Sequence, residues 1–245
     1  MAIIIFILVL WYGGLFFQTF FLHRYAAHQT FTMSKTMEKV TYVLTWVFQG
    51  ASYLSAYGYG IMHRIHHAHT DTEKDPHSPK YDKTLFAMMW KTKSIYQDIN
   101  KGRIEVEERF TTNIPQWKNF DLFASSIFSR VFWAVGYFAF FYFFATDWWQ
   151  WLLIPIVFLM APIHGVIINW FAHIYGYMNF QMKNTSKNLL PFDFLMMGEA
   201  YHNNHHKRSS NPNFGGVRWH EIDPTYLIMK VLDWLGLIQI KKVGS

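Results

Sequence analysis

Apolar runs without charged residues divide the chain into segments that are long enough to cross a membrane and segments that are not. The first run, 3–22, offers about 20 mainly apolar positions, the length that a membrane-spanning helix needs. Two further runs, 127–145 and 151–172, flank the short sequence TDWWQ, whose paired tryptophans are typical of a membrane interface. The pattern therefore predicts three transmembrane helices, at about 3–22, 127–145 and 151–172.

A fourth apolar segment, 40–60, is interrupted by polar residues and glycines from Gln49 onward. His28 precedes this segment and His63 follows it, so a single crossing would place the two histidines on opposite sides of the membrane. If they share a site, the segment cannot span, and we interpret it as an in-plane or shallowly re-entrant helix. The sequence thus predicts an all-α integral membrane protein, a single domain over 1–245, with a cytoplasmic helical cap that carries the histidine motifs.

The basic residues fall in two blocks. None of the 22 Lys and Arg residues lies in 1–23 or 131–182, and only 16% of the chain is charged. The positive-inside rule then places 29–126 and 174–245 in the cytoplasm, with Met1 and Asp147 on the other side. The net charge of +6 therefore does not indicate nucleic-acid binding. The first run lacks the basic start and the cleavage site of a signal peptide, so we expect it to remain as a membrane span.

The chain contains thirteen histidines, most of them clustered, and these are the candidate functional residues. In HRIHH the spacing i, i+3, i+4 places three imidazoles on one helical face, and the same spacing returns in HNNHH. Two identical triplets are hard to explain as surface decoration. These residues are His63, His66 and His67, then His202, His205 and His206.

A further pair, His23 and His28 in HRYAAH, stands at the end of the first span. Five residues apart, the two would point about 140° away from each other on a straight α-helix, so the pair alone is weak evidence. His173, in NWFAHIYG, is a ninth candidate at the end of the last span, and Asn169 lies four residues earlier on the same face.

So many imidazoles exceed the needs of one metal, since zinc takes four ligands in structural sites and usually three plus water in catalytic ones. They suit two metals. Imidazole binds zinc, copper, iron and nickel, so the ligand type does not choose between them. The absence of cysteine excludes thiolate ligands and disulfides.

Carboxylates accompany the triplets. A ligating imidazole usually donates its other N–H to a carboxylate or carbonyl, which fixes its orientation. We expect this role for Asp75, in DPHSP, and for Glu199, three residues before His202 and within reach of a ligand imidazole if a helix begins there. We interpret Glu73 as a solvated loop charge.

HRYAAH, HRIHHAHTDTEKDPHSP and GEAYHNNHH resemble the three histidine boxes of the membrane fatty-acyl desaturases, the family of stearoyl-CoA desaturase, in a bacterial-type short form. NWFAHIYG and WHEIDPTYLIMKVLDWLGL are also similar to that family, so the likeness runs from about residue 15 to the C-terminus. It implies two irons held by nine histidines, with Asn169 reaching one iron through water. The ligands so implied are His23, His28, His63, His66, His67, His173, His202, His205 and His206.

The resemblance implies that a cis double bond, first expected at Δ9, is made in a saturated acyl chain with O2 and two electrons. Removing hydrogen from an unactivated methylene requires a powerful oxidant, which iron can form from dioxygen and redox-inert zinc cannot, although zinc binds such sites in overexpressed protein. A dry cavity would protect so reactive a site. No fused cytochrome b5 or ferredoxin segment is recognisable, so we expect a separate electron donor of that kind with its reductase.

The sequence departs from the family in two places. Only one span precedes the first box, whereas the animal enzymes have a further helix there. Before HRIHH stands SAYGYGIM, where those enzymes carry the polar and charged residues that hold coenzyme A. The substrate is therefore expected to be an acyl-CoA or an acyl-lipid. Lys91 and Lys93 are candidates for an anionic head group, against the alternative of a basic patch at the membrane surface.

Two other functions compete. A related di-iron hydroxylase or ketolase would use the same boxes to insert oxygen, but the DPHSP and GEAYHNNHH contexts favour desaturation. A histidine-rich metal transporter is disfavoured because the histidines gather at one face. The spans themselves carry only His164 and Asn169 as obvious polar candidates for a pore.

Overall fold

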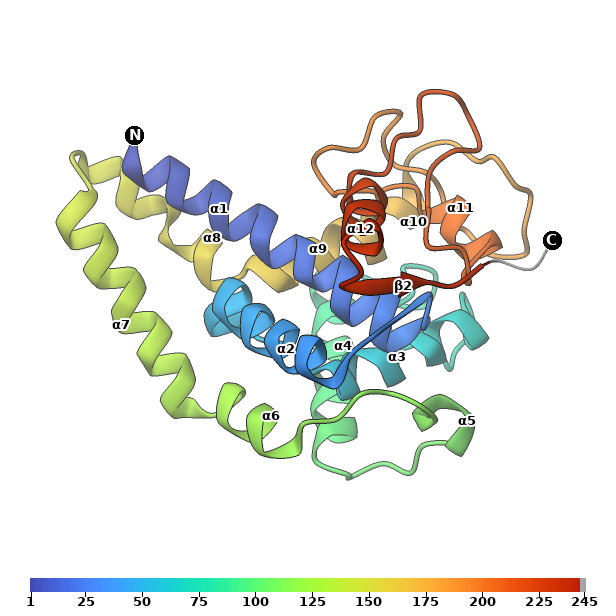
Figure 1. The fold of residues 1–245 in the computed structure, drawn as a ribbon, viewed down its shortest axis with the longest axis horizontal. Coiled ribbons are helices and arrows are strands. Elements are labelled where there is room, and N and C mark those ends of the chain that lie inside the picture. Colours follow the sequence, from blue (N-terminus) through green and yellow to red (C-terminus); the bar gives the residue numbers. More distant parts are fainter. Residues whose placement is uncertain (243–245) are drawn as a thin grey trace.

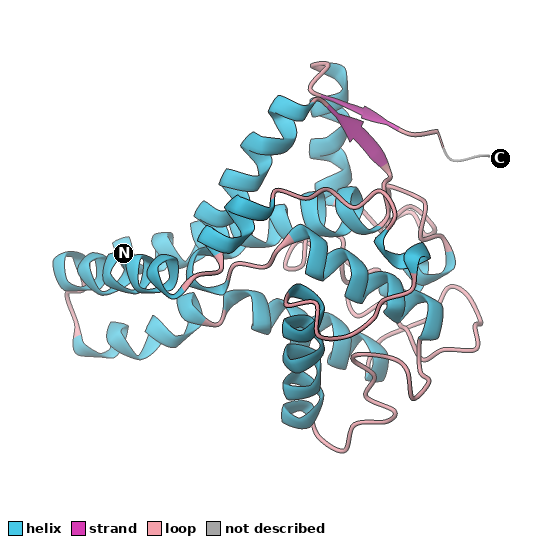
Figure 2. Ribbon diagram, turned by 90° about the horizontal axis from the view of Figure 1, so that it is seen from below, coloured by secondary structure: helices cyan, strands magenta, loops and turns pink. Residues whose placement is uncertain are grey.

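The computed structural model describes residues 1–242, and these are predominantly helical (Figure 1). The predicted all-α class is confirmed. The only strands in the described part of the chain are two short ones, β1 (Phe31–Met33) and β2 (Ile238–Ile240), which pair antiparallel with Phe31 opposite Ile240. Figure 2 shows this pair at one corner of the molecule, beside the ends of helices.

The first predicted span is a helix of 26 residues, in which α1 (Ala2–Phe17) continues without a break into η1 (Gln18–Ala27). Its α-helical part of 16 residues is about 24 Å long at 1.5 Å per residue, and the ten residues of η1 extend it beyond a hydrocarbon core of about 30 Å. Leu8 and Val9 are about half exposed, as expected of side chains that face lipid. The end of the helix that carries His23 therefore extends past the hydrocarbon.

The second predicted span is α7 (Ile127–Phe144), which Ser126 caps by accepting a hydrogen bond from the Ser129 amide at 3.1 Å. Most of its side chains are exposed and apolar. The chain then turns through Asp147 and the exposed Trp148, which stand at the end of α7 far from the cap (Figure 1). This agrees with the interfacial turn expected from TDWWQ.

The third predicted span, 151–172, is not the single straight helix that the sequence predicts. The segment Trp148–Phe158 meets the segment Met160–Ile174 at 70°. Pro162 explains the break, because it lacks the N–H that would bond to the carbonyl of Phe158 four residues earlier, and its ring crowds that carbonyl. The elements involved are η3 (Trp148–Leu153), α8 (Ile154–Phe158), α9 (Met160–Val166), η4 (Ile167–Phe171) and α10 (Ala172–Ile174).

The ambiguous segment forms α2 (Lys35–Gln49), which at 15 residues is too short to cross a membrane. It packs alongside α1, and Phe48 near its end occupies the space that a side chain at Gly13 would need. Since Gly13 lies near the middle of the first span, α2 reaches that depth and the chain then turns back through η2 (Gly50–Ser52). Gly50 allows the turn with φ of +53°. The arrangement matches a re-entrant helix.

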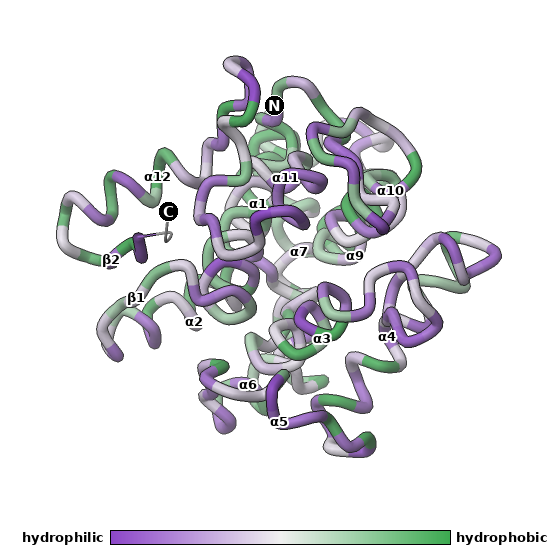
Figure 3. Tube along the Cα trace, turned by 90° about the vertical axis from the view of Figure 1, so that its right-hand side faces the viewer, coloured by the Kyte–Doolittle hydropathy of each residue, from purple (hydrophilic) through white to green (hydrophobic). Residues whose placement is uncertain are grey.

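The cap is built from the remaining helices, which gather at the η1 end of the first span (Figures 1 and 3). Buried side chains of η1 and α3, among them Phe20, Leu22 and Ile61, form one hydrophobic cluster that fixes these two helices against each other. The cap helices are α3 (Ala56–His69), α4 (Leu85–Asn100), α5 (Glu108–Thr111), α6 (Lys118–Ala124), α11 (His202–Lys207) and α12 (Pro224–Trp234).

Candidate metal centre

The nine predicted histidines come together in two groups, although they arise from four separate parts of the chain. Within each group, one nitrogen from every ring lies within 4.8 Å of the corresponding nitrogens of the others. The first group contains five and the second four. They are His23, His28, His63, His67 and His205, and His66, His173, His202 and His206.

In the first group the rings meet through their Nε2 atoms. His205 Nε2 lies 3.0 Å from that of His23 and 2.8 Å from that of His67. The Nε2 atoms of His28 and His63 are 2.8 Å apart. Two nitrogens about 2.0–2.1 Å from one metal ion, at 90–110° to each other, would lie about 2.8–3.4 Å apart. The spacing therefore suits nitrogens that share a metal ion.

The second group has the same geometry. His202 Nε2 lies 3.0 Å from the Nε2 atoms of both His173 and His206, and His206 Nε2 lies 3.2 Å from that of His66. His66 and His67 are neighbours on α3, yet they belong to different groups. The helix α3 therefore lies between two sites and supplies both.

The relation of His23 to His28 differs from the sequence prediction. The two rings do not point about 140° apart, because η1 is a π-helix and not a straight α-helix. The amide of His28 donates to the carbonyl of His23, five residues earlier, at 3.0 Å. A residue five positions on thus returns to the same face, and the ring centroids are 5.0 Å apart. The wider helix is what brings both residues into the first group.

Asp75 contacts a ring of the second group, as expected. Its Oδ1 lies 2.9 Å from Nδ1 of His66, and both side chains are fully buried. The same carboxylate accepts from the backbone amides of His77 and Asp71, at 3.0 and 2.9 Å. Asp75 is therefore rigidly held, and it fixes the orientation of the His66 ring.

Glu199 also contacts an imidazole, but not that of its neighbour His202. No helix begins at Glu199; α11 starts at His202, after a turn in which Met197 and Gly198 have positive φ. The carboxylate lies instead 2.7 and 2.8 Å from Nδ1 of His23. Burial alone would raise the pKa of Glu199, but the charge and hydrogen bond of His23 outweigh it, so that the pKa is lowered.

Arg24 was missed from the sequence. It is completely buried, with Nη2 donating to Asp223 Oδ2 at 2.6 Å and Nε to the carbonyl of Pro212 at 2.9 Å. Its guanidinium also bonds Thr19 and stacks on Phe214, 3.8 Å from the ring centroid. Arg24 thus ties the end of the first span to the cap. No local sequence signal indicates a pairing across 199 residues.

Asp71 was assigned no role from the sequence. Its carboxylate accepts from Ser78 Oγ at 2.7 Å and from the Thr185 amide at 2.6 Å. The hydroxyl of Thr185 lies 3.1 Å from Nδ1 of His173. Burial alone would raise the pKa of Asp71. The hydrogen bonds from Ser78 and Thr185 have the larger and opposite effect, so the pKa is lowered. Asp71 therefore positions His173 through Thr185.

His63 and His205 are in the form that binds metals. Burial, reinforced by the neighbouring imidazoles, lowers the pKa of His63 and His205 well below the usual range. At neutral pH these rings are uncharged, with a lone pair on one nitrogen available to a metal. His77 was not predicted. It is buried 4.4 Å from the His66 ring, and neither of its nitrogens has a partner among the described residues.

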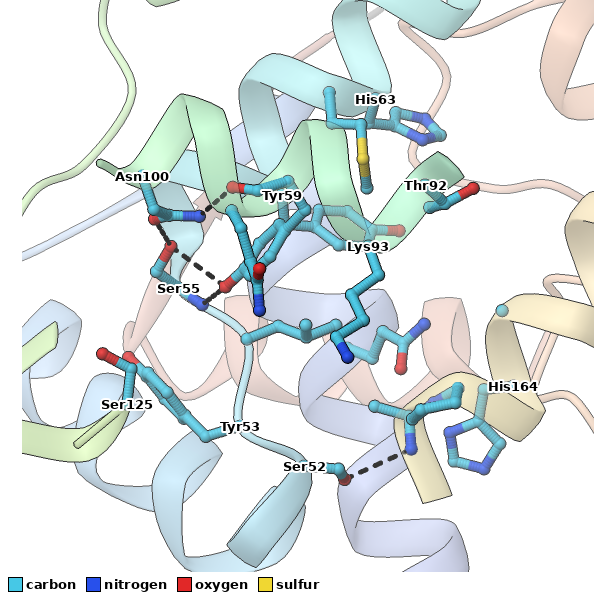
Figure 4. Close-up of a pocket in the computed structure, with 18 of the residues that line it drawn as sticks. Ser52, Tyr53, Ser55, Tyr59, His63, Thr92, Lys93, Asn100, Ser125 and His164 are labelled. Atoms are coloured by element: carbon cyan, nitrogen blue, oxygen red, sulfur yellow. Dashed lines mark hydrogen bonds between the residues drawn. The ribbon is translucent and has the colours of Figure 1, made fainter. Parts of the chain in front are cut away.

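A cavity of about 1380 Å³ is lined by His202 and Glu199. His63 and Lys93 are among the other residues of its wall (Figure 4). Asn169, the predicted indirect ligand, lines it on η4. Lys93 also lines it, with Nζ 4.7 Å from the Trp90 ring centroid. Lys91, the second head-group candidate, is directed elsewhere. Its Nζ donates to the carbonyl of Asp75 at 2.9 Å and lies 3.7 Å from Asp82.

Comparisons with known proteins identify the family. The family model described as fatty acid desaturase matches residues 1–237. The Delta-9 desaturase-like 5 protein of Arabidopsis thaliana is 29% identical, over 93% of this chain and 72% of the relative. Delta-9 acyl-lipid desaturase 2 of the same plant is 29% identical over 91% and 69%. An acyl-CoA 5-desaturase of Anemone leveillei is 28% identical over 95% and 69%.

Proposed function

The chain belongs to the fatty acid desaturase family, and we propose that it is a membrane-bound di-iron enzyme that introduces a cis double bond at Δ9 into a saturated acyl chain. Members of this family are oxygen-dependent oxidoreductases. The observation that carries the proposal is the pair of histidine groups beside a large cavity, which His23, His63 and His202 line. In the overall reaction the acyl chain loses two hydrogen atoms. O2 takes up these two hydrogens together with two electrons and two protons, which gives two waters.

The nine histidines would hold the two irons, one group for each. The first group offers five imidazoles and the second four, and Asn169 would contribute to the second through water. The two metals would then have the same number of donors. The irons would supply the oxidant that this reaction needs, which zinc in the same site could not. Asp75 and Glu199 orient the imidazoles, and Arg24 and Asp71 hold that arrangement together.

The cavity supports an acyl substrate. It leads away from the histidines between α1, α4 and α9, and its outer part is lined by the exposed Lys93, Lys101 and Lys118. These cations would bind a phosphate-bearing head group, which acyl-CoA and phospholipids share. The relatives named above include both an acyl-lipid and an acyl-CoA enzyme, and both Δ9 and Δ5 positions, so likeness alone does not choose between carriers.

Electrons would come from a separate donor, a ferredoxin or cytochrome b5 with its reductase. The histidines would face the cytoplasm, with the spans in a bacterial inner membrane. The histidine groups lie where the cap meets the ends of the first and last spans, so the donor is expected to dock on the cap side.

The test is the fatty-acid composition of cells that lack their own desaturase and express this chain. New double bonds, located by mass spectrometry, are expected from the wild type. They should disappear in His202→Ala and persist in His220→Ala, a histidine outside both groups, at equal protein levels in the membrane. Hydroxylated chains would favour a hydroxylase. Altered cellular metal content without new lipids would favour a transporter.

A further inference from the structure

The wall of the large cavity includes side chains that lie on the outer surface of the molecule. Four of them are apolar and between 70% and 83% exposed. They are Phe86 and Trp90 of α4, Leu122 of α6 and Ile127 at the start of α7. Side chains exposed to this extent form a rim and not an interior wall. The cavity therefore opens to the outside of the protein through this apolar rim.

The rim continues into the lipid-facing side of α7. Ile127, Val131 and Phe138 are spaced i, i+4 and i+11, which places them on one helical face, and each is at least half exposed. The helix is long and apolar enough to cross a membrane. On the α4 side of the rim, the Lys93 ammonium lies over the Trp90 ring, a combination typical of a membrane surface. The opening therefore faces the bilayer at its surface.

A smaller groove of about 380 Å³ adjoins the cavity. The residues that line both spaces are Ala51, Arg130, Phe158 and Leu159. The groove is completed by Val131 and Ala134, which belong to α7. Because Phe158 and Leu159 stand at the bend of the third predicted span, the groove runs between two spans, at the depth of the hydrocarbon. Arg130 is the one charged residue among those of its wall.

Arg130 lies where the cavity and the groove meet. Its Nη1 donates to the carbonyl of Ala51 at 3.1 Å, and its Nε donates to that of Ser125 at 3.4 Å. Ser125 itself borders the cavity (Figure 4). A guanidinium has five N–H groups, so these two bonds hold it in place and leave others for a ligand. Since arginine matches the oxygens of a phosphate with paired N–H donors, a phosphate is the group expected between the two spaces.

We propose that the substrate is a diacyl phospholipid, which enters the cavity sideways from the bilayer. One acyl chain lies in the cavity, beside the histidines of its wall, and the second lies in the groove along α7, while the phosphate binds Arg130. The inference rests on the proposed function, because it takes an acyl chain as the occupant, and it selects one of the two carriers left open there. An acyl-CoA has a single acyl chain and would leave the groove without an occupant.

The experiment fills the groove from the protein side. Ala134→Trp places a large side chain where the second acyl chain would lie, and Val135→Trp places the same side chain on the exposed face of α7 outside the groove. Binding is measured on the purified protein in detergent, as displacement of a fluorescent octadecanoic acid. The competitors are distearoylphosphatidylglycerol, stearoyl-lysophosphatidylglycerol and stearoyl-CoA, compared at equal mole fractions in the micelle.

The wild type is expected to bind the phospholipid, and Ala134→Trp should weaken that binding about 10-fold through steric conflict. The two single-chain competitors should bind this variant as they bind the wild type, which also shows that it is folded. Val135→Trp should behave as the wild type. Arg130→Met should weaken the phospholipid about 10-fold, because charge-assisted hydrogen bonds to the phosphate are lost, and should leave displacement by octadecan-1-ol unchanged.

A phospholipid that fails to displace the probe from the wild type would overturn the inference, as would equal affinities of the phospholipid for Ala134→Trp and the wild type. Val131→Trp, at the other α7 position of the groove, gives the same test if Ala134→Trp does not fold. Double-bond formation in cells is measured in parallel. Double bonds without the effect of Ala134→Trp overturn the inference and leave the proposed function standing. The effect of Ala134→Trp without double bonds contradicts the proposed function and supports the lipid site.

Discussion

Glu199 Oε2 lies 2.7 Å from Nδ1 of His23, a residue 176 positions away, and both side chains are buried. The opposite nitrogen of the same ring, Nε2, faces His205 at 3.0 Å. One imidazole is thus fixed at both of its nitrogens, by a carboxylate from the third box on one side and by the first histidine group on the other. The third box therefore controls the orientation of a side chain in the first.

Glu199→Gln is expected to lower iron content or double-bond formation about 10–100-fold, the usual effect of removing the outer partner of a ligating imidazole. The amide keeps the shape but loses the charge that faces His23 and Arg24. The measurements are iron per chain by elemental analysis and double bonds in the lipid extract.

The matched control is Glu73→Gln, which removes an exposed carboxylate in the loop after α3. Substitutions at such positions usually change stability by less than about 0.5 kcal/mol, so iron and activity should be close to wild type. Full iron and full activity in Glu199→Gln would show that the carboxylate is dispensable for orienting His23.

Arg24→Met is expected to destabilise the fold by about 3–5 kcal/mol, because it leaves the carboxylates of Asp223 and Glu199 buried without their cation. The measurement is thermal unfolding of the metal-free protein in detergent. Arg103→Met is the control, since Arg103 and Asp98 form an exposed pair at 3.4 Å worth about 0–1 kcal/mol. Similar unfolding temperatures for the two variants would contradict the conclusion that Arg24 holds the end of the first span to the cap.

Acid should destabilise the metal-free protein below about pH 6.5, the ordinary pKa of histidine. Burial lowers the pKa of eight histidines outside the spans, so the folded chain binds fewer protons than the unfolded chain, and stability falls as the pH drops through that value. Burial raises the pKa of Asp121 and Asp193 to about 6 and also raises that of Asp223, which acts in the opposite direction, but these are three groups against eight.

Unfolding midpoints between pH 5 and pH 8 test this expectation. A midpoint that is constant or rises toward pH 5 would mean that the imidazoles are not buried in their neutral form. Metal retention should follow the same trend, because protonated imidazole cannot bind a metal.

Membrane orientation is testable with single cysteines, since the chain has none of its own. Glu73→Cys, in the cap, should resist a membrane-impermeant thiol reagent added to intact cells and react after lysis. Asp147→Cys, in the turn after α7, should react in intact cells. Labelling of position 73 from outside would reverse the orientation that we assign to the cap.

The histidine triplets on α3 and α11 were recognisable from the sequence because helical periodicity is local: i, i+3 and i+4 share a face wherever the helix lies. The approach of His23 to His28 was not recognisable from the sequence, because the angle between the two side chains depends on η1 being a π-helix. Pro162 was a sequence signal for the bend in the third predicted span. Because the bend itself lies three residues earlier, at Leu159, the apolar pattern still predicted one straight helix.

Long-range pairs were beyond the sequence altogether. Asp75 could be assigned to an imidazole of its own motif, because only nine residues separate it from His66. Glu199 does contact an imidazole, but the imidazole is that of His23 on η1 and not that of His202. Arg24 with Asp223 had no signal, because a single chain carries no record of which distant charges meet.

The pairing of β1 with β2 bears on how the protein is made. β1 begins three residues after His28, and β2 follows all nine histidines in the sequence. During synthesis the early boxes therefore emerge long before α11 and β2 exist. Contacts so distant in the chain form late, because closing long loops is entropically costly. The two histidine groups are complete only once translation has passed His206, their last member, so neither full set of imidazoles exists until most of the chain has been made.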